Sequence, residues 1–203
     1  MIGESTGNLG EIVRLFADGG PVMVMLALIA VILYSTATAA LFFVSKGNLT
    51  SKREDQWPDW IEHPDHGEGR AGEVIRYAVH GPRLSIKTVQ RRFDEIREIL
   101  IDSIDRRLII IGTLVAAAPM TGLLGTVGGM LDMFDGLASG GGKQSMDKIA
   151  GGMKEALFTT LTGLVIALPG MFMALHIRQK RNWIAAALSR IESAIVAKRF
   201  KTL

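Results

Sequence analysis

Three stretches of the sequence are almost wholly apolar: 21–44, 108–134 and 156–177. Because about 20 apolar residues at ~1.5 Å per residue cover the ~30 Å hydrocarbon core of a bilayer, each stretch predicts a transmembrane helix. The first and third contain no Asp, Glu, Lys or Arg, and the second contains none before Asp132. The pattern therefore predicts an all-α membrane protein with three transmembrane helices.

The apolar periodicity of the second and third stretches continues into polar sequence. Within 83–107, and again within 178–203, apolar residues recur every three or four positions, which marks one face of a helix. We expect both transmembrane helices to extend well beyond the bilayer and to pair these faces. The residues are Ile86, Val89, Phe93, Ile96, Leu100 and Ile104 in the first face, and Ile184, Leu188, Ile191 and Ile195 in the second.

The remaining segments are polar. Residues 1–20 are weakly amphipathic, which is typical of a segment on a membrane surface. The insert 45–107 is expected to be loop-like as far as Pro82, because Pro and Gly interrupt any long periodicity, and helical from 83 to 107. Residues 135–155 are interpreted as a short link between the second and third spans.

The distribution of Lys and Arg orients the spans. One such residue precedes the first span, twelve lie in the insert 45–107, three in the link 135–155, and seven after the third span. Since cytoplasmic loops carry the excess of Lys and Arg, we expect a cytoplasmic insert and C-terminus, with the N-terminus and the link on the outer side. The long C-terminal helix 178–203 would then be cytoplasmic.

Composition excludes several classes of function. The 203 residues include no Cys, which rules out disulfides, thiolate metal ligands and Cys nucleophiles. The 23 basic and 20 acidic residues give a net charge of only +3, so we expect no nucleic-acid partner. No grouping of Ser, His and an acid suggests hydrolysis. We therefore expect neither an enzyme nor a cofactor.

Two polar motifs are set aside. His63-Pro-Asp-His66 with Glu68 contains metal-ligating residue types, but Pro and Gly surround it and no helix fixes its geometry. A solvated loop is preferred there over a metal site. Gly140-Gly-Gly-Lys143 lacks the first Gly of a phosphate-binding loop and is followed by Gln144, so no nucleotide site is expected.

The second and third stretches are rich in small residues. In membranes, small residues let helix backbones approach closely, so we expect these two helices to pack against protein rather than lipid. Gly125 and Gly129 form a GxxxG pair within this pattern. The positions assigned to packing are Gly122, Gly125, Gly129, Gly163, Pro119 and Pro169.

No ionisable side chain lies near the middle of the second or third span. Asp132 and Glu155 are ~16 Å outward of the two midpoints, at the outer boundary. Thr126 and Thr160 lie only ~8 to 9 Å outward, and so are expected at about equal depth. Their hydroxyls can bond their own helices, as most membrane Thr residues do, or line a polar pathway, and spacing alone leaves both open.

Two segments contain long motifs. Ala118-Pro-Met-Thr-Gly-Leu-Leu-Gly-Thr-Val-Gly-Gly-Met130 is similar to the Ala-Pro-x-x-Gly-Leu-x-Gly-Thr-Val-x-Gly segment of the MotA/TolQ/ExbB proton-channel family. Glu155-Ala-Leu-Phe-Thr-Thr-Leu-Thr-Gly-Leu-Val-Ile-Ala-Leu-Pro169 resembles the Glu-Ala-Leu-x-x-Thr-x-x-Gly-Leu-x-x-Ala-x-Pro segment of its third span. The resemblance extends from about residue 83 to the C-terminus. Three spans rather than four favour the ExbB/TolQ branch.

The resemblance implies a pore-forming homopentamer in the bacterial inner membrane, with a periplasmic N-terminus. Its second and third helices would enclose an ExbD/TolR-like single-span partner that supplies a membrane Asp. Matched by motif position, Thr126, Thr160 and Glu155 would belong to the proton pathway, and the packing residues above would surround the pore. Proton flow would drive a TonB- or TolA-like periplasm-spanning protein, for TonB-dependent outer-membrane transport or TolQ-like envelope maintenance.

Two residues depart from the family pattern. Gly128 stands where Trp is usual, and Gly151 stands where Pro often precedes the motif Glu by four residues. Both changes loosen the packing of the outer rim, and neither touches the Thr positions. Two other interpretations remain, namely a non-conducting membrane scaffold and an oligomer that conducts by itself. The absence of a mid-membrane carboxylate weakens the second.

Overall fold

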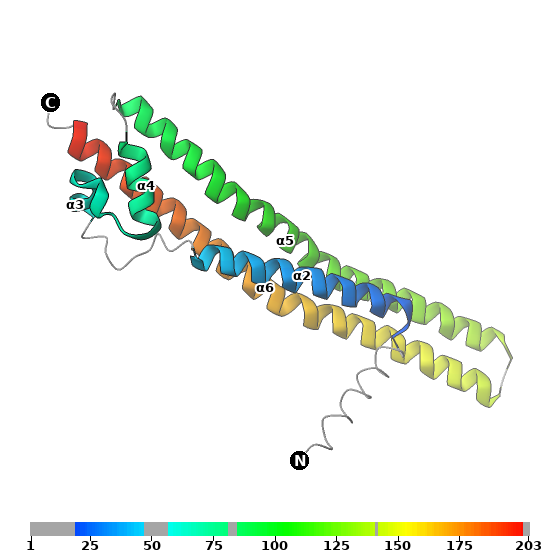
Figure 1. Cartoon of the computed structure of the whole chain (residues 1–203). Helices are drawn as coiled ribbons and strands as arrows, with labels where there is room; N and C mark the ends of the chain where they lie inside the picture. Colours follow the sequence, from blue (N-terminus) through cyan, green and yellow to red (C-terminus); the bar gives the residue numbers. More distant parts are fainter. Residues whose placement is uncertain (1–18, 47–56, 81–84, 141, 201–203) are drawn as a thin grey trace, which may run out of the picture. The chain divides into compact units, whose positions relative to one another are not determined.

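The structure is a computed structural model that describes residues 19–46, 57–80, 85–140 and 142–200. Its elements are α2 (Gly20–Lys46), α3 (Trp57–Glu62), the 3-10 turn η2 (Pro64–His66), α4 (Gly69–Val79), α5 (Ile86–Ala138) and α6 (Lys143–Phe200) (Figure 1). Every described element is helical, which confirms the predicted all-α class. The predicted amphipathic segment 1–20 lies almost wholly outside the described residues.

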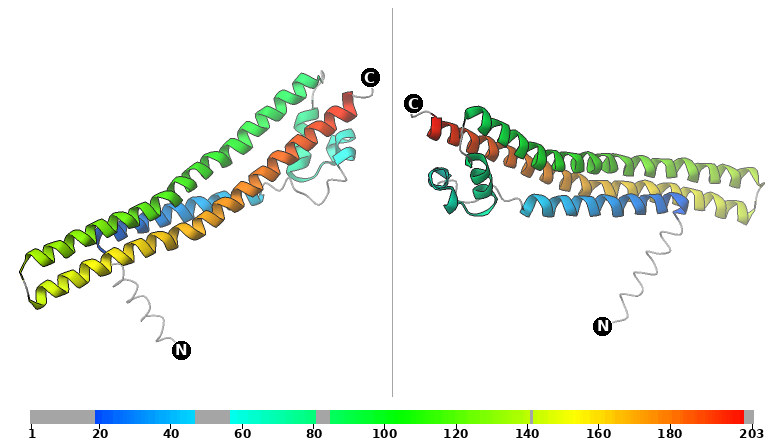
Figure 2. Two further views of the ribbon diagram at one scale, coloured as in Figure 1. Left: turned by 180° about the vertical axis from the view of Figure 1, so that it is seen from behind. Right: turned by 45° about the horizontal axis from the view of Figure 1, so that its top comes forward.

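Two compact units make up the chain, and α2, α5 and α6 contribute to both. Unit 1 consists of Met1–Ala37 and Ile110–Phe172, and unit 2 consists of Thr38–Ile109 and Met173–Leu203. Within unit 1, the three long helices run side by side, and α5 turns back into α6 (Figure 2). Unit 1 therefore contains the hairpin formed by most of the second and third predicted spans.

Three helices, α2, α5 and α6, are long and apolar enough to cross a membrane. On α2, one face is buried in unit 1 at Met23 and Leu26, whereas Val24 and Val31 are 61% and 68% exposed. Lipid solvates such exposed side chains, and a helix satisfies its own backbone polar groups there. The fold is accordingly that of a multi-pass membrane protein.

The connection between α5 and α6 is much shorter than the sequence predicts. α5 continues to Ala138 and α6 begins at Lys143, so most of the expected link 135–155 is helical. The charges of this segment disfavour lipid, but Lys, Met, Ala and Glu are good helix formers in water. The two helices also remain attached, since the Ser145 hydroxyl on α6 donates a hydrogen bond to the carbonyl of Gly136 on α5.

A small helical cluster replaces the loop predicted in the first part of the insert. Trp57 and Trp60 of α3 are buried, and α4 buries Val74 and Ile75. The loop prediction is wrong because Pro and Gly delimit short helices here instead of preventing them. Pro58, for example, lies in the first turn of α3, where a missing N–H removes no helical hydrogen bond.

In unit 2, α5 and α6 bury most of the apolar faces predicted for them. Val89 and Phe93 on α5 and Leu188 on α6 have no exposed surface, and Ile86, at the start of α5, is 41% exposed. The other buried members of the two faces are Ile104, Ile184, Ile191 and Ile195. The periodicity therefore identifies the contact side of both helices correctly.

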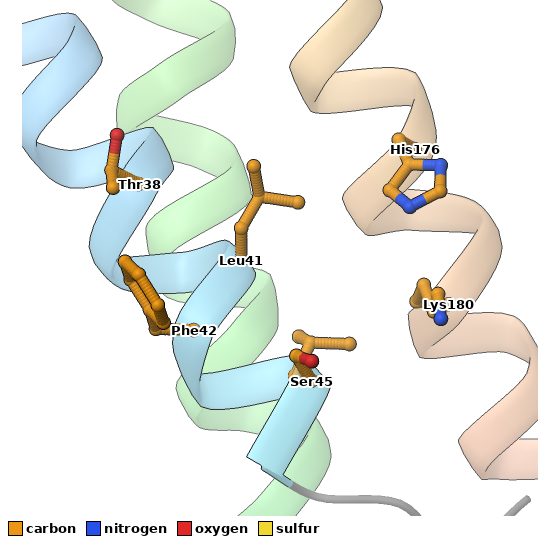
Figure 3. A pocket seen from close by; sticks show the side chains of 7 residues that line it. Thr38, Leu41, Phe42, Ser45, His176 and Lys180 are labelled. Carbon is orange, nitrogen blue, oxygen red and sulfur yellow. The ribbon is translucent and has the colours of Figure 1, made fainter.

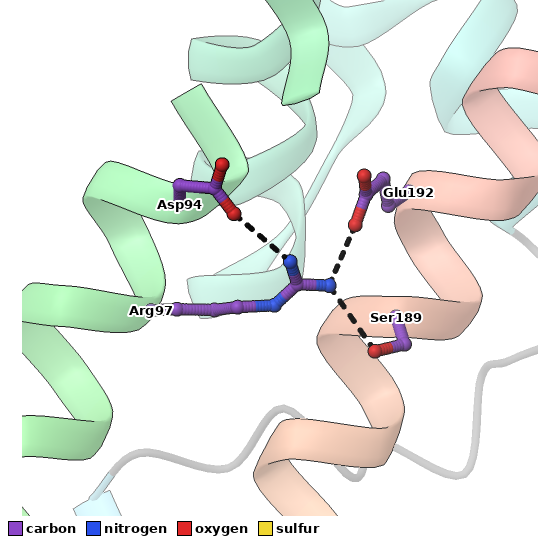
Figure 4. A network of polar contacts seen from close by, with 4 residues as sticks. All are labelled: Asp94, Arg97, Ser189 and Glu192. Carbon is purple, nitrogen blue, oxygen red and sulfur yellow. Dashed lines mark hydrogen bonds and ion pairs between the residues drawn. The ribbon is translucent and has the colours of Figure 1, made fainter. Parts of the chain in front are cut away.

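Ion pairs flank the apolar faces of α5 and α6. Arg97 of α5 donates to Glu192 Oε2 of α6 at 2.6 Å and to Ser189 Oγ at 3.1 Å, and it also reaches Asp94 (Figure 4). Because an Arg fork imposes its geometry on its carboxylate partner, such pairs define the register between helices.

A second pair acts in the same way closer to the predicted membrane. Arg181 of α6 donates to Asp105 of α5 through two nitrogens, at 2.9 and 2.6 Å. This two-point contact adds directional constraint to an interface otherwise held by apolar packing.

Cations from the long helices contact the short helices, beginning with the carboxyl end of α4. Arg92 of α5 donates to the carbonyls of Tyr77, Ala78 and His80, where α4 ends. The last carbonyls of a helix lack intrahelical partners and carry partial negative charge, so a guanidinium there is favourable. Arg92 therefore attaches α4 to α5.

Two cations at the end of α6 contact both ends of α3. Lys198 donates to the Pro58 carbonyl at 2.7 Å and pairs with Glu62 at 2.9 Å, and Arg199 donates to the Ile61 carbonyl. The Lys198 hydrogen bond lowers the pKa of the Glu62 carboxyl. Both short helices thus depend on cations contributed by the long ones.

We predict that Arg92→Met loosens α4. The substitution keeps the aliphatic stem and removes the donors to three carbonyls, so we expect a loss of about 1 kcal/mol in unfolding free energy, small because the site is partly exposed. Faster amide hydrogen exchange across α4 would report it.

Arg91→Met is the matched control. Among the described residues, Arg91 pairs with the exposed Glu95 in an i,i+4 contact, so its removal changes stability by less than ~0.5 kcal/mol. Equal exchange rates in α4 of the two variants would contradict a capping role for Arg92.

Candidate functional site

The unit-1 parts of α5 and α6 approach each other so closely that their backbones touch. A Cβ built on Gly122 would lie 2.8 Å from the carbonyl oxygen of Thr159, and one on Gly163 would lie 2.6 Å from that of Ala118. Real Cβ atoms are essentially never found at such distances from backbone atoms. Glycine is therefore the residue that this interface requires at both positions, as in other close membrane helix pairs.

The GxxxG pair lies in the same interface. A Cβ on Gly125 would overlap the side chain of Thr159, and one on Gly129 would overlap the carbonyl of Gly152. Gly128, between them on another face, has nothing within 4 Å of its added Cβ. The packing glycines predicted from the sequence thus make their close contacts inside the hairpin of one chain.

Thr159 is a site residue that the motif comparison did not single out. It is the one polar side chain in the described part of α6's apolar run with no exposed surface, and its hydroxyl donates to the Glu155 carbonyl at 2.9 Å. The absence of a side chain at Gly125 makes the space that Thr159 occupies. The sequence could have identified Thr159 as the residue opposite the GxxxG pair only if the register of the two helices were known.

The two predicted pathway hydroxyls have different partners. Thr126 donates to the carbonyl of Leu123 in its own helix at 2.6 Å. Thr160, which is partly buried, crosses to the neighbouring helix and donates to the carbonyl of Gly122 at 3.2 Å. In this state, both hydroxyl protons are engaged by backbone carbonyls, and the oxygen lone pairs remain as acceptors.

The expectation of equal depth for these residues is wrong by about one helical turn. Thr160 lies at the level of Gly122, which is four residues from Thr126, or ~6 Å at 1.5 Å per residue. The error arises because span midpoints taken from hydropathy do not fix how two antiparallel helices align. Their glycine contacts fix it instead.

Two prolines interrupt the hydrogen-bond ladders of the hairpin. Pro119 lies inside α5 and Pro169 inside α6, and each removes one N–H donor. Near the second gap, Tyr34 of α2 donates to the carbonyl of Ile166 at 3.0 Å. Tyr34 was not among the predicted site residues, although a lone Tyr hydroxyl in an apolar span is expected to seek such a partner.

Glu155 contacts the start of α2. A Cβ on Gly20 would overlap the Glu155 carboxylate, and Gly20 has φ of +61°, a conformation that favours glycine. The first N–H groups of a helix lack partners and carry partial positive charge, so a carboxylate is well placed there. The structure thus gives Glu155 a contact with the first span that its motif position does not reveal.

Large apolar side chains cover the outer faces of the hairpin. Met120 and Leu131 on α5, and Leu157 and Leu168 on α6, are each more than half exposed in the single chain. Such a surface needs lipid or another protein chain to cover it. The hairpin therefore presents extensive apolar surface beyond that needed for its own packing.

No metal centre appears in the part of the chain that the structure describes. No group of three His, Asp or Glu residues is gathered there. The His63 and His66 rings lie with centroids 5.4 Å apart, and His66 is 3.9 Å from Asp59, with both side chains well exposed. This geometry is an exposed contact at η2.

Comparison with known proteins places the hairpin in a family. Residues 71–190, which include both quoted motifs, match the MotA/TolQ/ExbB proton channel family. Among similar curated proteins, the putative biopolymer transport protein ExbB-like 1 of Synechocystis sp. is 37% identical over 92 residues, and the biopolymer transport protein exbB1 of Vibrio cholerae is 41% identical over 66. The Tol-Pal system protein TolQ of Haemophilus influenzae is 32% identical over 90.

These alignments are partial. They cover 41%, 32% and 44% of this chain, and 35%, 28% and 39% of the respective relatives. The chain thus spans about a third of the length of the curated relatives that it matches. The family match, over residues 71–190, includes the hairpin.

We predict opposite effects for two neighbouring glycines of α5. Gly125→Ala forces the new methyl group into Thr159, and overpacking of this kind costs about 1 to 3 kcal/mol. Gly128→Ala adds a methyl group to open space and gains up to about 1 kcal/mol in helix propensity. Thermal unfolding of the two purified variants in the same detergent measures the difference.

The pair tests the packing directly, because the chemical change is identical and the positions are three residues apart. Gly125→Ala should lower the melting temperature, and Gly128→Ala should leave it unchanged or raise it. Equal melting temperatures would show that α5 and α6 do not approach through Gly125.

Proposed function

This chain belongs to the MotA/TolQ/ExbB proton channel family, in its ExbB/TolQ branch, and from that premise we propose that it is a pore-forming subunit of an inner-membrane motor driven by proton motive force. The observation that carries the proposal is the glycine-packed hairpin, in which the two motif Thr residues lie among backbone contacts. The first span and the long helical extensions complete the subunit.

A ring of subunits accounts for the apolar surface of the hairpin. Exposed residues such as Leu131 and Leu157 need lipid or protein around them, and copies of the chain can supply it. We propose a homopentamer in which the second and third spans surround a central pore. The Lys and Arg distribution favours a cytoplasmic unit 2 and a periplasmic N-terminus.

The pore needs a proton carrier from another chain. Between residues 108 and 131, and between 156 and 177, the sequence contains no Asp or Glu. A group that is protonated and deprotonated within a membrane is usually a carboxyl, and such groups mark proton relays. We propose that an ExbD/TolR-like single-span protein places its membrane Asp inside the ring.

The Thr hydroxyls would act on the protonation state of that Asp. Thr126 and Thr160 already donate their protons to carbonyls, so each oxygen can accept a hydrogen bond from a protonated carboxyl group. In this arrangement the neutral form of the Asp is favoured. To favour the ionised form, a hydroxyl must rotate away from its carbonyl and donate to the carboxylate.

The energy available to such a motor is set by the membrane potential. Each proton that crosses gains ~2.3 kcal/mol per 100 mV. We propose that this energy reaches a TonB-like periplasm-spanning protein, for TonB-dependent outer-membrane transport, or a TolA-like one, for envelope maintenance. The names of the similar proteins include both ExbB and TolQ and favour neither outcome.

We predict that Thr160→Val abolishes proton flux while the complex still assembles. Valine keeps the shape of Thr and removes both the donor to Gly122 and the acceptor for a partner carboxyl. The variant also cannot donate to the ionised carboxylate, a hydrogen bond worth about 1.5 to 3 kcal/mol, so flux should fall at least about tenfold. It is measured with a pH-sensitive dye in liposomes that contain this chain and its co-purified partner.

Thr160→Ser is the control, because it retains the hydroxyl and should retain most of the flux. The mass of each purified complex establishes that assembly is intact. Wild-type flux in Thr160→Val would count against a role for Thr160 in proton transfer. A wild-type complex that conducts no protons under any potential would favour a non-conducting membrane scaffold.

A further inference from the structure

Unit 2 contains a pocket of about 410 Å³ between the end of α2 and α6. Thr38, Leu41 and Phe42 of α2 line one side, and His176 and Lys180 of α6 line the other (Figure 3). The remaining lining residues are Val44 and Ser45. The volume lies in the range of small-molecule sites, ~300 to 1,000 Å³, so the pocket can accept a polar head group with part of an alkyl chain.

The polar side of this pocket is positive. His176 and Lys180 are four residues apart and therefore share one face of α6. Within the described part of the chain Lys180 forms no ion pair, whereas its neighbour Arg181 is bound to Asp105 through two nitrogens. None of the seven described lining residues is acidic. The pocket thus offers an uncompensated ammonium and an imidazole donor.

The opposite side of the pocket is apolar and open. Phe42 is 65% exposed there. The adjacent aromatic residue on α2, Phe43, lies 5.0 Å from the Arg107 guanidinium and 5.8 Å from that of Arg70. Cations therefore cover Phe43 by cation–π contacts, whereas Phe42 has no such contact with the residues that the structure describes. A ligand with both an anionic group and a hydrocarbon chain would satisfy both sides.

The position of the pocket along the chain matches a membrane boundary. Ser45 directly follows the uncharged run 21–44, and His176 lies one residue before the end of the third apolar run, 156–177. Lys180 lies within a turn of that end. Phosphate groups of a bilayer are found at this level, and basic pockets between transmembrane helices bind anionic lipid head groups.

We propose that this pocket binds one anionic glycerophospholipid. The head-group phosphate lies between Lys180, His176 and the Ser45 hydroxyl, and one acyl chain follows the apolar side formed by Leu41 and Phe42. The site would hold α2 against α6 at the end of the first span. It does not depend on proton conduction, because no pathway residue takes part in it.

The test uses native mass spectrometry of the purified full-length complex after equilibration with lipid and stepwise detergent washing. The probes are phosphatidylglycerol, phosphatidylcholine and inorganic phosphate. We expect phosphatidylglycerol to survive washing longest. Since a Lys near an anionic surface contributes ~1 kcal/mol, Lys180→Gln should reduce its retention about fivefold.

Arg178→Gln is the matched control. Arg178 is exposed, lies two residues from Lys180 on the same helix and does not line the pocket. Arg178→Gln should leave the retention of phosphatidylglycerol unchanged. If the basic helix attracted anionic lipid only by its general charge, Arg178→Gln and Lys180→Gln would weaken retention equally. A second variant, Ser45→Trp, fills the pocket without changing charge and should also reduce retention.

Three outcomes would overturn the proposal. If Arg178→Gln and Lys180→Gln lost phosphatidylglycerol equally, the retention would result from general surface charge and not from the pocket. Equal retention of phosphatidylcholine would remove the need for an anionic head group, and displacement of the lipid by inorganic phosphate alone would assign the site to a free anion. Full retention in Ser45→Trp would place the lipid elsewhere.

Discussion

The close approach of the α5 and α6 backbones in unit 1 is the constraint from which the other features of the hairpin follow. Where two backbones touch, only glycine fits, and this fixes Gly122, Gly129 and Gly163. It also brings the Thr160 hydroxyl within 3.2 Å of a carbonyl in the other helix. The polar contact between the two spans thus forms because glycine, which has no side chain, lets the Thr160 hydroxyl reach the backbone of the other helix.

The same two helices pair by different physics in unit 2. There they bury Phe93, Leu188 and other large side chains, as helices do in water, where expulsion of solvent drives association. In lipid that driving force is absent, and packing and hydrogen bonds must replace it. Each helix has large interface residues in unit 2 and small ones in unit 1. This change is the one expected of a helix that passes from water into lipid.

Periodicity in the sequence predicts the long helices and their buried faces, but it does not predict features that depend on local turn chemistry or on helix register. The three apolar helices and the buried faces of 83–107 and 178–203 are visible as patterns. The α3–α4 cluster was missed because Pro58 can begin a helix as well as end one, and the choice depends on burial of Trp57 and Trp60. Thr159 was missed because its role exists only opposite Gly125.

The register of α5 and α6 constrains any mechanism that uses both Thr126 and Thr160. Thr126 and Thr160 differ in level by ~6 Å along the helices, and a hydrogen bond between oxygens spans only ~2.5 to 3.0 Å. A single carboxyl oxygen therefore cannot bond both hydroxyls at once.

Ring formation does not remove this offset. Rotation about an axis along the membrane normal moves each residue to another copy at the same depth, so Thr126 of one subunit and Thr160 of the next stay at different levels. A carboxyl oxygen that carries the proton inside such a ring would meet the two hydroxyls one after the other, by moving along the pore or through intervening water. The α5–α6 register thus favours a stepwise pathway over a single shared site.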